Sequence, residues 1–268
     1  MDETLADPEA LERFEYASWT GLVGVAPPGL AADLGLKTRD IAGTTAVIAP
    51  NLPSGEFNRG ALVPGVDLAD ILAFLRQGAP QAIVQIAEPL MTPALEASLR
   101  ADGCTPAPNH WIMLARGPGT PPPPRTALSL REIGPESAEE AGSVFARGYG
   151  MPPAMGAWMA QLVGQPGWRV FAAFDGDRIV GVGNLCQDGA RAIMLGAATL
   201  PEARGRGAQT ALLALRIAEA TRAGAQLIQA HTGLPLGAEK NPSLDNMHRA
   251  GFEDRYRRLN WRVRPSAS

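Results

Sequence analysis

The stretch that decides the fold is Pro201-Glu-Ala-Arg-Gly-Arg-Gly-Ala-Gln-Thr210, called the glycine turn below. It follows the apolar, strand-like run 192–200 and precedes a helical run from Thr210 to Arg222. Two glycines before a helix let several backbone N–H groups without intrahelical partners approach one anion, at the positive end of the helix dipole. Arg204 and Arg206 add cationic side chains that suit phosphate oxygens. The turn therefore predicts a binding site for a pyrophosphate group.

The composition is that of a soluble globular protein. Of 268 residues, 46% are hydrophobic and 19% are charged, so we expect a sizeable core. A net charge of −3 argues against an extended nucleic-acid surface. No apolar run approaches the ~20 residues that span a bilayer, and the acidic N-terminus lacks an apolar signal core. Cys104 and Cys186 have no metal-ligand spacing. We expect a cytoplasmic protein without a metal site, bound to neither nucleic acid nor membrane.

A proline-rich segment predicts the domain boundary. Arg116-Gly-Pro-Gly-Thr-Pro-Pro-Pro-Pro-Arg125 contains four consecutive prolines, which remove backbone donors and favour a stiff, extended linker. It predicts an N-terminal domain over residues 1–116, a linker over 117–125 and a C-terminal domain over 126–268. Both domains have ordinary sizes.

The C-terminal part has regular periodicity and predicts the order β-α-α-β-β-β-α-β-α-β-β. Asp175-Gly176 and Asp188-Gly189 predict hairpin turns. Ser137 and Glu140 have the spacing of a capping box at the start of the first helix. The strands are expected at 126–133, 168–174, 179–185, 192–199 and 226–231, with two more through 263, and the helices at 137–149, 154–163, 210–222 and 243–250.

The N-terminal part predicts a β-α-β-α-β succession without a second glycine turn of this type. Asp67 and Thr92 are expected to be the N-caps of two helices, over 67–77 and 92–101. The first forty residues are ambiguous and give no firm prediction. The three strands are expected at 45–49, 82–87 and 111–115.

Beyond the turn, the chain ends its last helix with Ser243-Leu-Asp-Asn-Met-His-Arg-Ala-Gly-Phe252. The chain resembles the GNAT acetyltransferase superfamily over about residues 126–264. The resemblance lies in the order of the hairpin strands, the glycine turn, the long helix, the next strand and this last segment. In the superfamily's cofactor motif, Q/R-x-x-G-x-G/A, Arg204 and Gly207 match, whereas Gln209 replaces the usual small residue. A Rossmann dinucleotide site would need a parallel strand before the turn, whereas this turn follows hairpin strands. A P-loop would need a Gly-Lys-Ser/Thr sequence, which is absent from the turn. The remaining alternative is a turn with a purely structural role.

The resemblance implies an α/β (α+β) fold, with a mixed, mostly antiparallel sheet flanked by helices. It also implies that the N-terminal part is a degenerate second GNAT-like half, which binds no coenzyme A and instead walls the acceptor cleft or stabilises the other half. The implied cofactor is acetyl-CoA. Ala197, Ala198 and Thr199 would pair with its pantetheine amides as a strand would. The backbone that would hold its pyrophosphate belongs to Arg204, Gly205, Arg206, Gly207, Ala208 and Gln209.

Acyl transfer to an amine needs a proton acceptor for the amine and a proton donor for the leaving thiolate. Relatives often place a donor Tyr four residues before the Gly of Gly-Phe, where this chain has Met247. Water or Tyr256 could replace it, and Asn246 could bind pantetheine or a water, or serve only the helix. His231, at a strand end where the family's sheet opens, is the candidate base, and a hydrogen-bonded structural histidine is the alternative.

These residues predict an acyl-CoA-dependent N-acyltransferase that transfers acetyl directly from acetyl-CoA to an amine, because no activated Cys or Ser is evident. The alternative is a non-catalytic acyl-CoA binding or sensing module, and thioester hydrolysis or decarboxylation on the same cofactor also stays open. The acceptor is a small-molecule or peptide amine, and the protein is a monomer or homodimer. Further candidates for the acceptor pocket are Glu239, Tyr149, Trp158 and Trp168.

Overall fold

A computed structural model describes residues 6–52, 54–237 and 239–265. The helices are α1 Pro8–Gly24, α2 Pro28–Leu34, α3 Leu68–Leu75, α4 Pro93–Ala101, α5 Ala138–Tyr149, α6 Pro153–Ala160, α7 Ala208–Arg222 and α8 Pro242–Arg249. The strands are β1 Lys37–Ile41, β2 Thr44–Ile48, β3 Arg59–Ala61, β4 Ile83–Ala87, β5 Thr105–Pro106, β6 Trp111–Arg116, β7 Ser129–Glu132, β8 Trp168–Asp175, β9 Arg178–Asp188, β10 Arg191–Met194, β11 Ala197–Thr199, β12 Leu227–Gly233 and β13 Glu253–Arg262. No helix in these ranges is long and apolar enough to cross a membrane.

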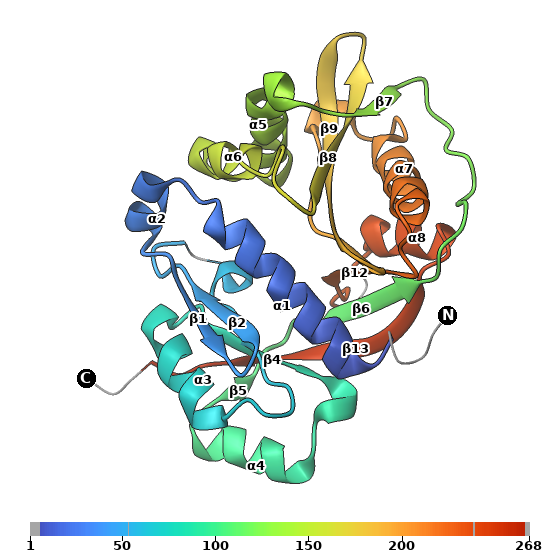
Figure 1. Cartoon of the computed structure of the whole chain (residues 1–268). Helices are drawn as coiled ribbons and strands as arrows, with labels where there is room; N and C mark the ends of the chain where they lie inside the picture. The colour runs from blue at the N-terminus through green and yellow to red at the C-terminus, as the bar shows by residue number, and fades with distance from the viewer. Residues whose placement is uncertain (1–5, 53, 238, 266–268) are drawn as a thin grey trace.

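One mixed, mostly antiparallel sheet runs through the molecule and is flanked by helices (Figure 1). Its strand order is β1-β2-β3-β4-β13-β6-β12-β10-β9-β8-β7, with β11 paired to β9 and β5 to β13 outside this path. The parallel pairs are β3 with β4 and β10 with β12. The predicted fold class is confirmed.

The C-terminal half, from residue 126, follows the predicted order with two differences. The strand expected at 192–199 is broken into β10 and β11, and the two final strands are one, β13, with an irregularity between Asp254 and Tyr256. The capping-box prediction is wrong. The Ser137 side chain caps nothing, and Glu140 Oε1 instead accepts a hydrogen bond from the backbone N–H of Ile179 at 2.9 Å.

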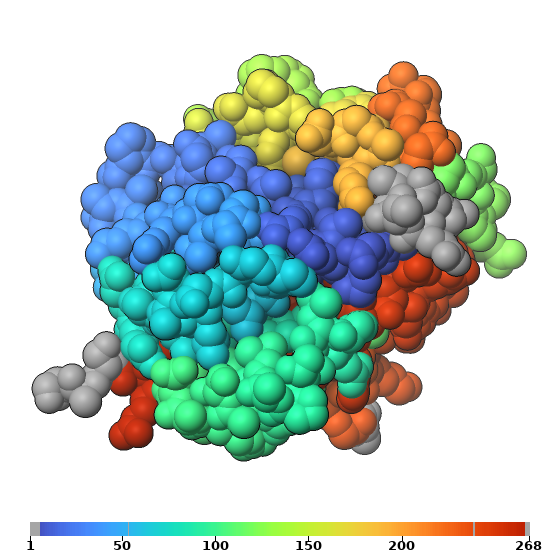
Figure 2. All heavy atoms as spheres, turned by 60° about the horizontal axis from the view of Figure 1, so that its bottom comes forward, coloured from blue at the N-terminus to red at the C-terminus, as the bar shows by residue number. Residues whose placement is uncertain are grey.

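The N-terminal half, up to residue 116, contains the expected elements. It also contains the helices α1 and α2 and the short strands β1, β3 and β5, which the sequence did not predict. Asp67 and Thr92 cap α3 and α4, as predicted. From residue 6 to residue 40 the chain forms α1, α2 and most of β1, and the apolar face of α1 is buried through Leu11, Trp19 and Leu22. Figure 2 shows the dark blue part of the chain, which follows the grey residues, filling the surface between the teal and the yellow-orange parts.

The two halves exchange strands across their junction. β6, which precedes the proline-rich segment, lies between β12 and β13, and β13 lies between β6 and β4. The first part of β13 pairs with β6 and its last part pairs with β4, and Arg258 is paired on both sides. The sheet is therefore continuous from β1 to β7, while the division into domains at residues 117–125 stays a prediction. In Figure 1 that segment is the green loop running from β6 up to β7.

Candidate active site

The sheet opens between β11 and β12. β10 pairs with β12 only as far as Met194 and Ala230, and beyond that point β12 continues beside β6 while β11 turns to β9. Gly196 allows this bend with a φ of +69°, and a Cβ there would lie 2.8 Å from the Phe145 ring. Strands that part within a sheet leave backbone groups without ladder partners, and these groups are available to an extended ligand.

Strand β11 directs alternate backbone groups into this opening. Gly196 O accepts a hydrogen bond from Asn184 N at 3.0 Å, and Leu200 N donates to Val180 O at 2.9 Å, so these positions face β9. The backbone groups of the alternate residues, Ala197 and Thr199, therefore face the opposite edge. In agreement, Ala197 N donates to the Tyr149 hydroxyl at 3.3 Å.

The glycine turn lies at the N-terminus of α7. Gly207 is the N-cap with a φ of +83°, and no side chain caps this helix within the described ranges, so its first-turn N–H groups are available to an anion. A Cβ on Gly207 would lie 2.5 Å from Arg125 O, and Thr126 Oγ1 donates to Arg206 O at 2.8 Å. The end of the proline-rich segment thus packs on the turn and requires glycine at position 207.

The two arginines of the turn are exposed and have weak partners. Arg204 donates to Gly148 O at 3.0 Å, and Arg206 pairs with Asp175 at 2.6 Å. Exposed contacts of this kind contribute little, because water competes for both charges. Both guanidinium groups can therefore exchange these partners for phosphate oxygens.

Gln209 and Asn246 connect the glycine turn to α8. Asn246 Nδ2 donates to Gln209 Oε1 at 2.8 Å, and Gln209 Nε2 donates to Ser243 Oγ at 3.1 Å. The residue that departs from the family motif thus has a partner on the helix that follows the opening. Both side chains line a small cavity of about 100 Å³ between β11, β12, α7 and α8.

A second cavity of about 270 Å³ continues this space toward the N-terminal half. Its walls are mostly aromatic and apolar, and they include two of the three aromatic residues predicted to line a pocket, Tyr149 and Trp168. The third, Trp158, is buried in the core and donates to Leu22 O at 2.8 Å. The residues that line both cavities are Tyr149, Met194, Gly196, His231 and Thr232.

His231 lies where the two cavities meet. Its ring stacks on Trp111 with a centroid distance of 5.0 Å and an interplanar angle of 8°. Its Nδ1 is 3.1 Å from Glu15 Oε2, on the buried face of α1. A carboxylate at Nδ1 favours the tautomer that carries its hydrogen there, which leaves the Nε2 lone pair for the cavity.

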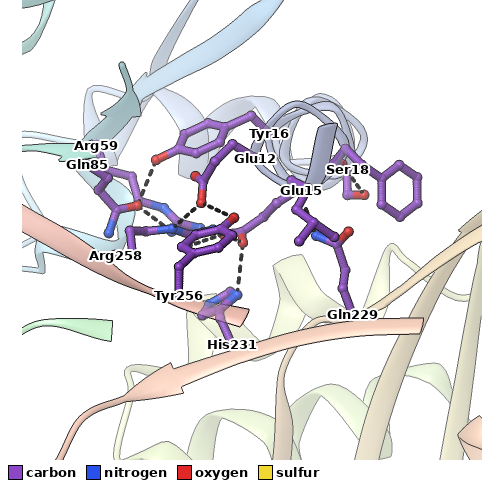
Figure 3. A network of polar contacts seen from close by, with 12 residues as sticks. Glu12, Glu15, Tyr16, Ser18, Arg59, Gln85, Gln229, His231, Tyr256 and Arg258 are labelled. Atoms are coloured by element: carbon purple, nitrogen blue, oxygen red, sulfur yellow. Dashed lines mark hydrogen bonds and ion pairs between the residues drawn. The ribbon is translucent and has the colours of Figure 1, made fainter. Parts of the chain in front are cut away.

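Glu15 belongs to a buried network of charges beneath α1 (Figure 3). Arg258 pairs with Glu15 through two nitrogens, at 3.0 and 2.5 Å, and with Glu12 at 2.9 Å, while Arg59 pairs with Glu15 at 3.0 Å. Burial alone would raise the pKa of Glu15, but Arg258, His231 and Arg59 outweigh it and hold that pKa well below its usual range. Glu15 is therefore ionised beside His231, and its carboxylate pairs with both guanidinium groups. Burial has the opposite effect on Glu12, whose pKa it raises.

Tyr256 lies inside this network and lines neither cavity. Its hydroxyl donates to Glu12 Oε1 at 2.8 Å, and burial raises its pKa well above the usual value. Glu239 is exposed in the loop before α8, where its carboxylate accepts a hydrogen bond from Leu236 N at 3.4 Å. The residues that the sequence missed are Glu15, from the ambiguous first forty residues, and Glu56, an isolated acid in a loop.

Comparison with known proteins assigns the C-terminal half. Residues 140–252 match the model of the acetyltransferase (GNAT) family, so the chain contains a GNAT acetyltransferase domain. Solved structures with the same fold include a GCN5-related N-acetyltransferase from Kribbella flavida, 15% identical with a TM-score of 0.62, covering 95% of this chain and 96% of that one. A tandem GNAT protein from the clavulanic acid biosynthesis pathway is 16% identical with a TM-score of 0.55, covering 99% of this chain and 97% of that one. The likeness in fold thus includes the N-terminal half.

A curated relative is the catalase easC of Aspergillus fumigatus, 29% identical over 174 residues. The match covers 59% of this chain and 34% of the relative, so the chain spans about a third of that relative's length.

Proposed function

We propose that the protein is an N-acetyltransferase that transfers acetyl directly from acetyl-CoA to an amine. The observation that carries the proposal is the uncapped glycine turn beside an opened sheet, with two joined cavities that meet at His231. The first-turn N–H groups and the arginines suit a pyrophosphate, and the free edge of β11 suits an amide-bearing arm. The residues present therefore fit acetyl-CoA, which would supply an activated thioester.

In the proposed reaction, the cavity of about 270 Å³, called the larger cavity because it exceeds the one of about 100 Å³ beside it, holds the amine. His231 Nε2 accepts a proton from the amine. The amine nitrogen forms a bond to the thioester carbonyl carbon, the carbon–sulfur bond breaks, and the thiolate leaves. With the thioester bound, the N–H of Ala197 would donate to the carbonyl oxygen in place of the Tyr149 hydroxyl and stabilise negative charge there. Glu15 keeps the His231 ring in its orientation and stabilises it when it is protonated.

Tyr149 takes the place of Tyr256 as the proton donor to the thiolate. Its hydroxyl lies within 3.3 Å of Ala197 N, at the junction of the two cavities. Removal of the hydroxyl from water and the negative charge of Glu56 raise the pKa of Tyr149, although the residue as a whole is 48% exposed. The phenol therefore carries its proton at neutral pH and can donate it.

Calorimetry with acetyl-CoA tests the cofactor site. Gly207→Ala should weaken binding by about tenfold or more. The alanine would have to keep an unfavourable positive φ, and its Cβ would overlap Arg125 O. Gly164→Ala is the matched control, since Gly164 has a φ of +82° but open space around it. Equal affinity for Gly207→Ala and the control would contradict the proposed site.

Release of free thiol over a panel of amines separates an enzyme from a sensor. We expect acetyl-CoA-dependent release with at least one amine, and a ~100-fold or larger fall in kcat for His231→Gln. Binding of acetyl-CoA without thiol release from any amine would instead favour the sensing module.

A further inference from the structure

We propose that Glu56 binds the ammonium group of the acceptor, and that the acceptor is a small primary amine on an apolar, preferably aromatic, body. This inference rests on the proposed function, because it concerns the amine that this site would acetylate. Glu56 comes from the N-terminal half, so that half would select the acceptor for a reaction catalysed in the other.

The position of Glu56 is fixed by its neighbours in a short 3-10 turn, η1 Gly55–Phe57. Ser54 Oγ accepts a hydrogen bond from Glu56 N at 3.2 Å and caps the turn. Phe57 packs edge-on against Trp19, with ring centroids 5.4 Å apart, and against Trp158, with ring centroids 5.5 Å apart. The turn is therefore held by the core, and it places Glu56 in the wall of the larger cavity.

The charge of this cavity points to a cation. Glu56 is the one acidic residue among its described lining residues, which include no lysine or arginine. Across the ranges that the structure describes, the Glu56 carboxylate makes neither a hydrogen bond nor an ion pair. A half-buried carboxylate loses hydration without gaining a partner, so an ammonium group from the acceptor would restore the lost interaction.

The Glu56 carboxylate lines the same cavity as two residues proposed to act in the reaction, Tyr149 and His231. Its negative charge contributes to the raised pKa of Tyr149, whose hydroxyl lies beside Ala197 N. An ammonium group bound by Glu56 would therefore lie in the same cavity as the residue that would accept its proton.

The walls of the cavity select the rest of the acceptor. Aromatic rings from both halves surround it, namely those of Trp19, Phe57, Trp111, Phe145, Tyr149 and Trp168. Such rings favour apolar groups and attract cations over their faces. A volume of about 270 Å³ is slightly below the range typical of drug-sized sites, which favours a small acceptor over a peptide or an oligosaccharide.

A broader cavity adjoins this one on the side of the N-terminal half. Glu56 and Trp111 also line a broad neighbouring cavity of about 820 Å³. The smaller cavity is lined by Gln209 of the glycine turn and by neither Glu56 nor Trp111. The amine would therefore approach Glu56 from the broad cavity, along residues that the cofactor's cavity does not share.

Binding of 2-phenylethylamine, followed by tryptophan fluorescence without acetyl-CoA, tests the inference independently of turnover. We expect 2-phenylethylamine to bind more tightly than its neutral analogue 2-phenylethanol. Glu56→Gln should weaken binding of the amine by about tenfold and leave the alcohol unchanged, because only the amine gains a charged partner. Glu56→Asp should retain part of the preference, and Glu139→Gln, an exposed acid on α5, is the control that should change nothing.

The outcomes separate this inference from the proposed function. If the amine binds no better than the alcohol, or if Glu56→Gln has no effect in a folded protein, the inference is wrong, even where another amine is acetylated. If 2-phenylethylamine binds as expected but no amine releases thiol from acetyl-CoA, the proposed transfer is wrong and the cation site stands. In turnover, Glu56→Gln should raise KM for the amine and leave the Kd of acetyl-CoA unchanged.

Discussion

Arg258 is the residue at which the two halves of the sheet meet. Its backbone is paired with β4 on one side and β6 on the other, and its buried side chain binds Glu12 and Glu15 of α1. A buried ion pair stabilises the fold only when each of its charges has a partner, because the charges have lost their hydration. The network therefore ties α1 to the junction of the sheet, and through Glu15 it reaches His231.

Removing one carboxylate from this network should destabilise the fold. Glu15→Gln leaves Arg59 and Arg258 without their main partner, and we expect the free energy of unfolding to fall by about 3–5 kcal/mol. Urea unfolding of the full chain measures it, with Glu139→Gln as the exposed control. A loss as small as that of the control would show that the network contributes little.

The contribution of Glu15 should also depend on pH. A pKa lowered in the folded state gives stability that is fully present above the unfolded value of about 4.3 and is lost as the pH falls through the folded value. The difference in unfolding free energy between the wild type and Glu15→Gln should therefore shrink below about pH 4. Burial raises the pKa of Glu12, and the neighbouring charge of Glu15 adds to this rise, so the difference reports the Glu12–Glu15 pair rather than Glu15 alone.

Single residues were predictable from the sequence where their chemistry is local. Asp67 and Thr92 cap helices because the acceptor and the N–H groups lie within three residues of each other. His231 was predicted as a candidate base, and the structure places it at the junction of the cavities. The sequence could not predict that Glu15 is the partner of His231, because the fold alone brings these two distant residues together.

Among the elements, α5 and α6 cross at two glycines. A Cβ on Gly142 would overlap the backbone oxygen of Gly156, and a Cβ on Gly156 would lie 2.6 Å from Gly142 O. This close approach lets α5 lie against β11 and holds Tyr149, the last residue of α5, at the cavities.

Gly142→Ala should separate these helices. We expect a loss of ~1–3 kcal/mol in unfolding free energy from overpacking, and a lower kcat because Tyr149 moves with the helix. Gly29→Ala, in α2 with open space around it, should be neutral or slightly stabilising, because alanine favours the helix. Thermal unfolding of both variants makes the comparison, and a Gly142→Ala protein as stable as Gly29→Ala would contradict the contact.

The periodicity of the sequence predicted which segments are helices and which are strands, but it did not predict where a strand is broken or how a helix begins. The run 192–199 has the composition of one strand. Its bend at Gly196 leaves no room for a side chain, because a Cβ there would lie 2.8 Å from the ring of Phe145, which is far away in the sequence. Likewise, Ser137 and Glu140 have the spacing of a capping box, but Glu140 binds β9 because that strand lies beside it. In both cases a tertiary contact outweighs a local preference.

For the whole molecule, the exchange of strands makes each half depend on the other. We expect residues 126–268 produced alone to be insoluble or unfolded, because β12 and β13 would lose β6 and expose unpaired edges. Circular dichroism and gel filtration of this fragment, beside the full chain, make the test. A soluble, folded fragment that binds acetyl-CoA would show that the C-terminal half is independent.

The sequence indicated the two halves but not their exchange. Proline composition marks a boundary locally, whereas β6 and β13 have the patterns of ordinary strands and carry no signal for their partners. Pairing over such separations is decided by the packing of the whole sheet, including the buried charges of α1.

The place of β13 also affects how the chain folds during its synthesis. β4 and β6 leave a gap that only β13 fills, and the residues of β13 are translated on the order of ten seconds after β6 at typical ribosomal rates. Until then, both flanking strands expose edges that can pair with other nascent chains. The nascent chain is thus expected to need a chaperone on these two edges while the acetyltransferase domain is being made.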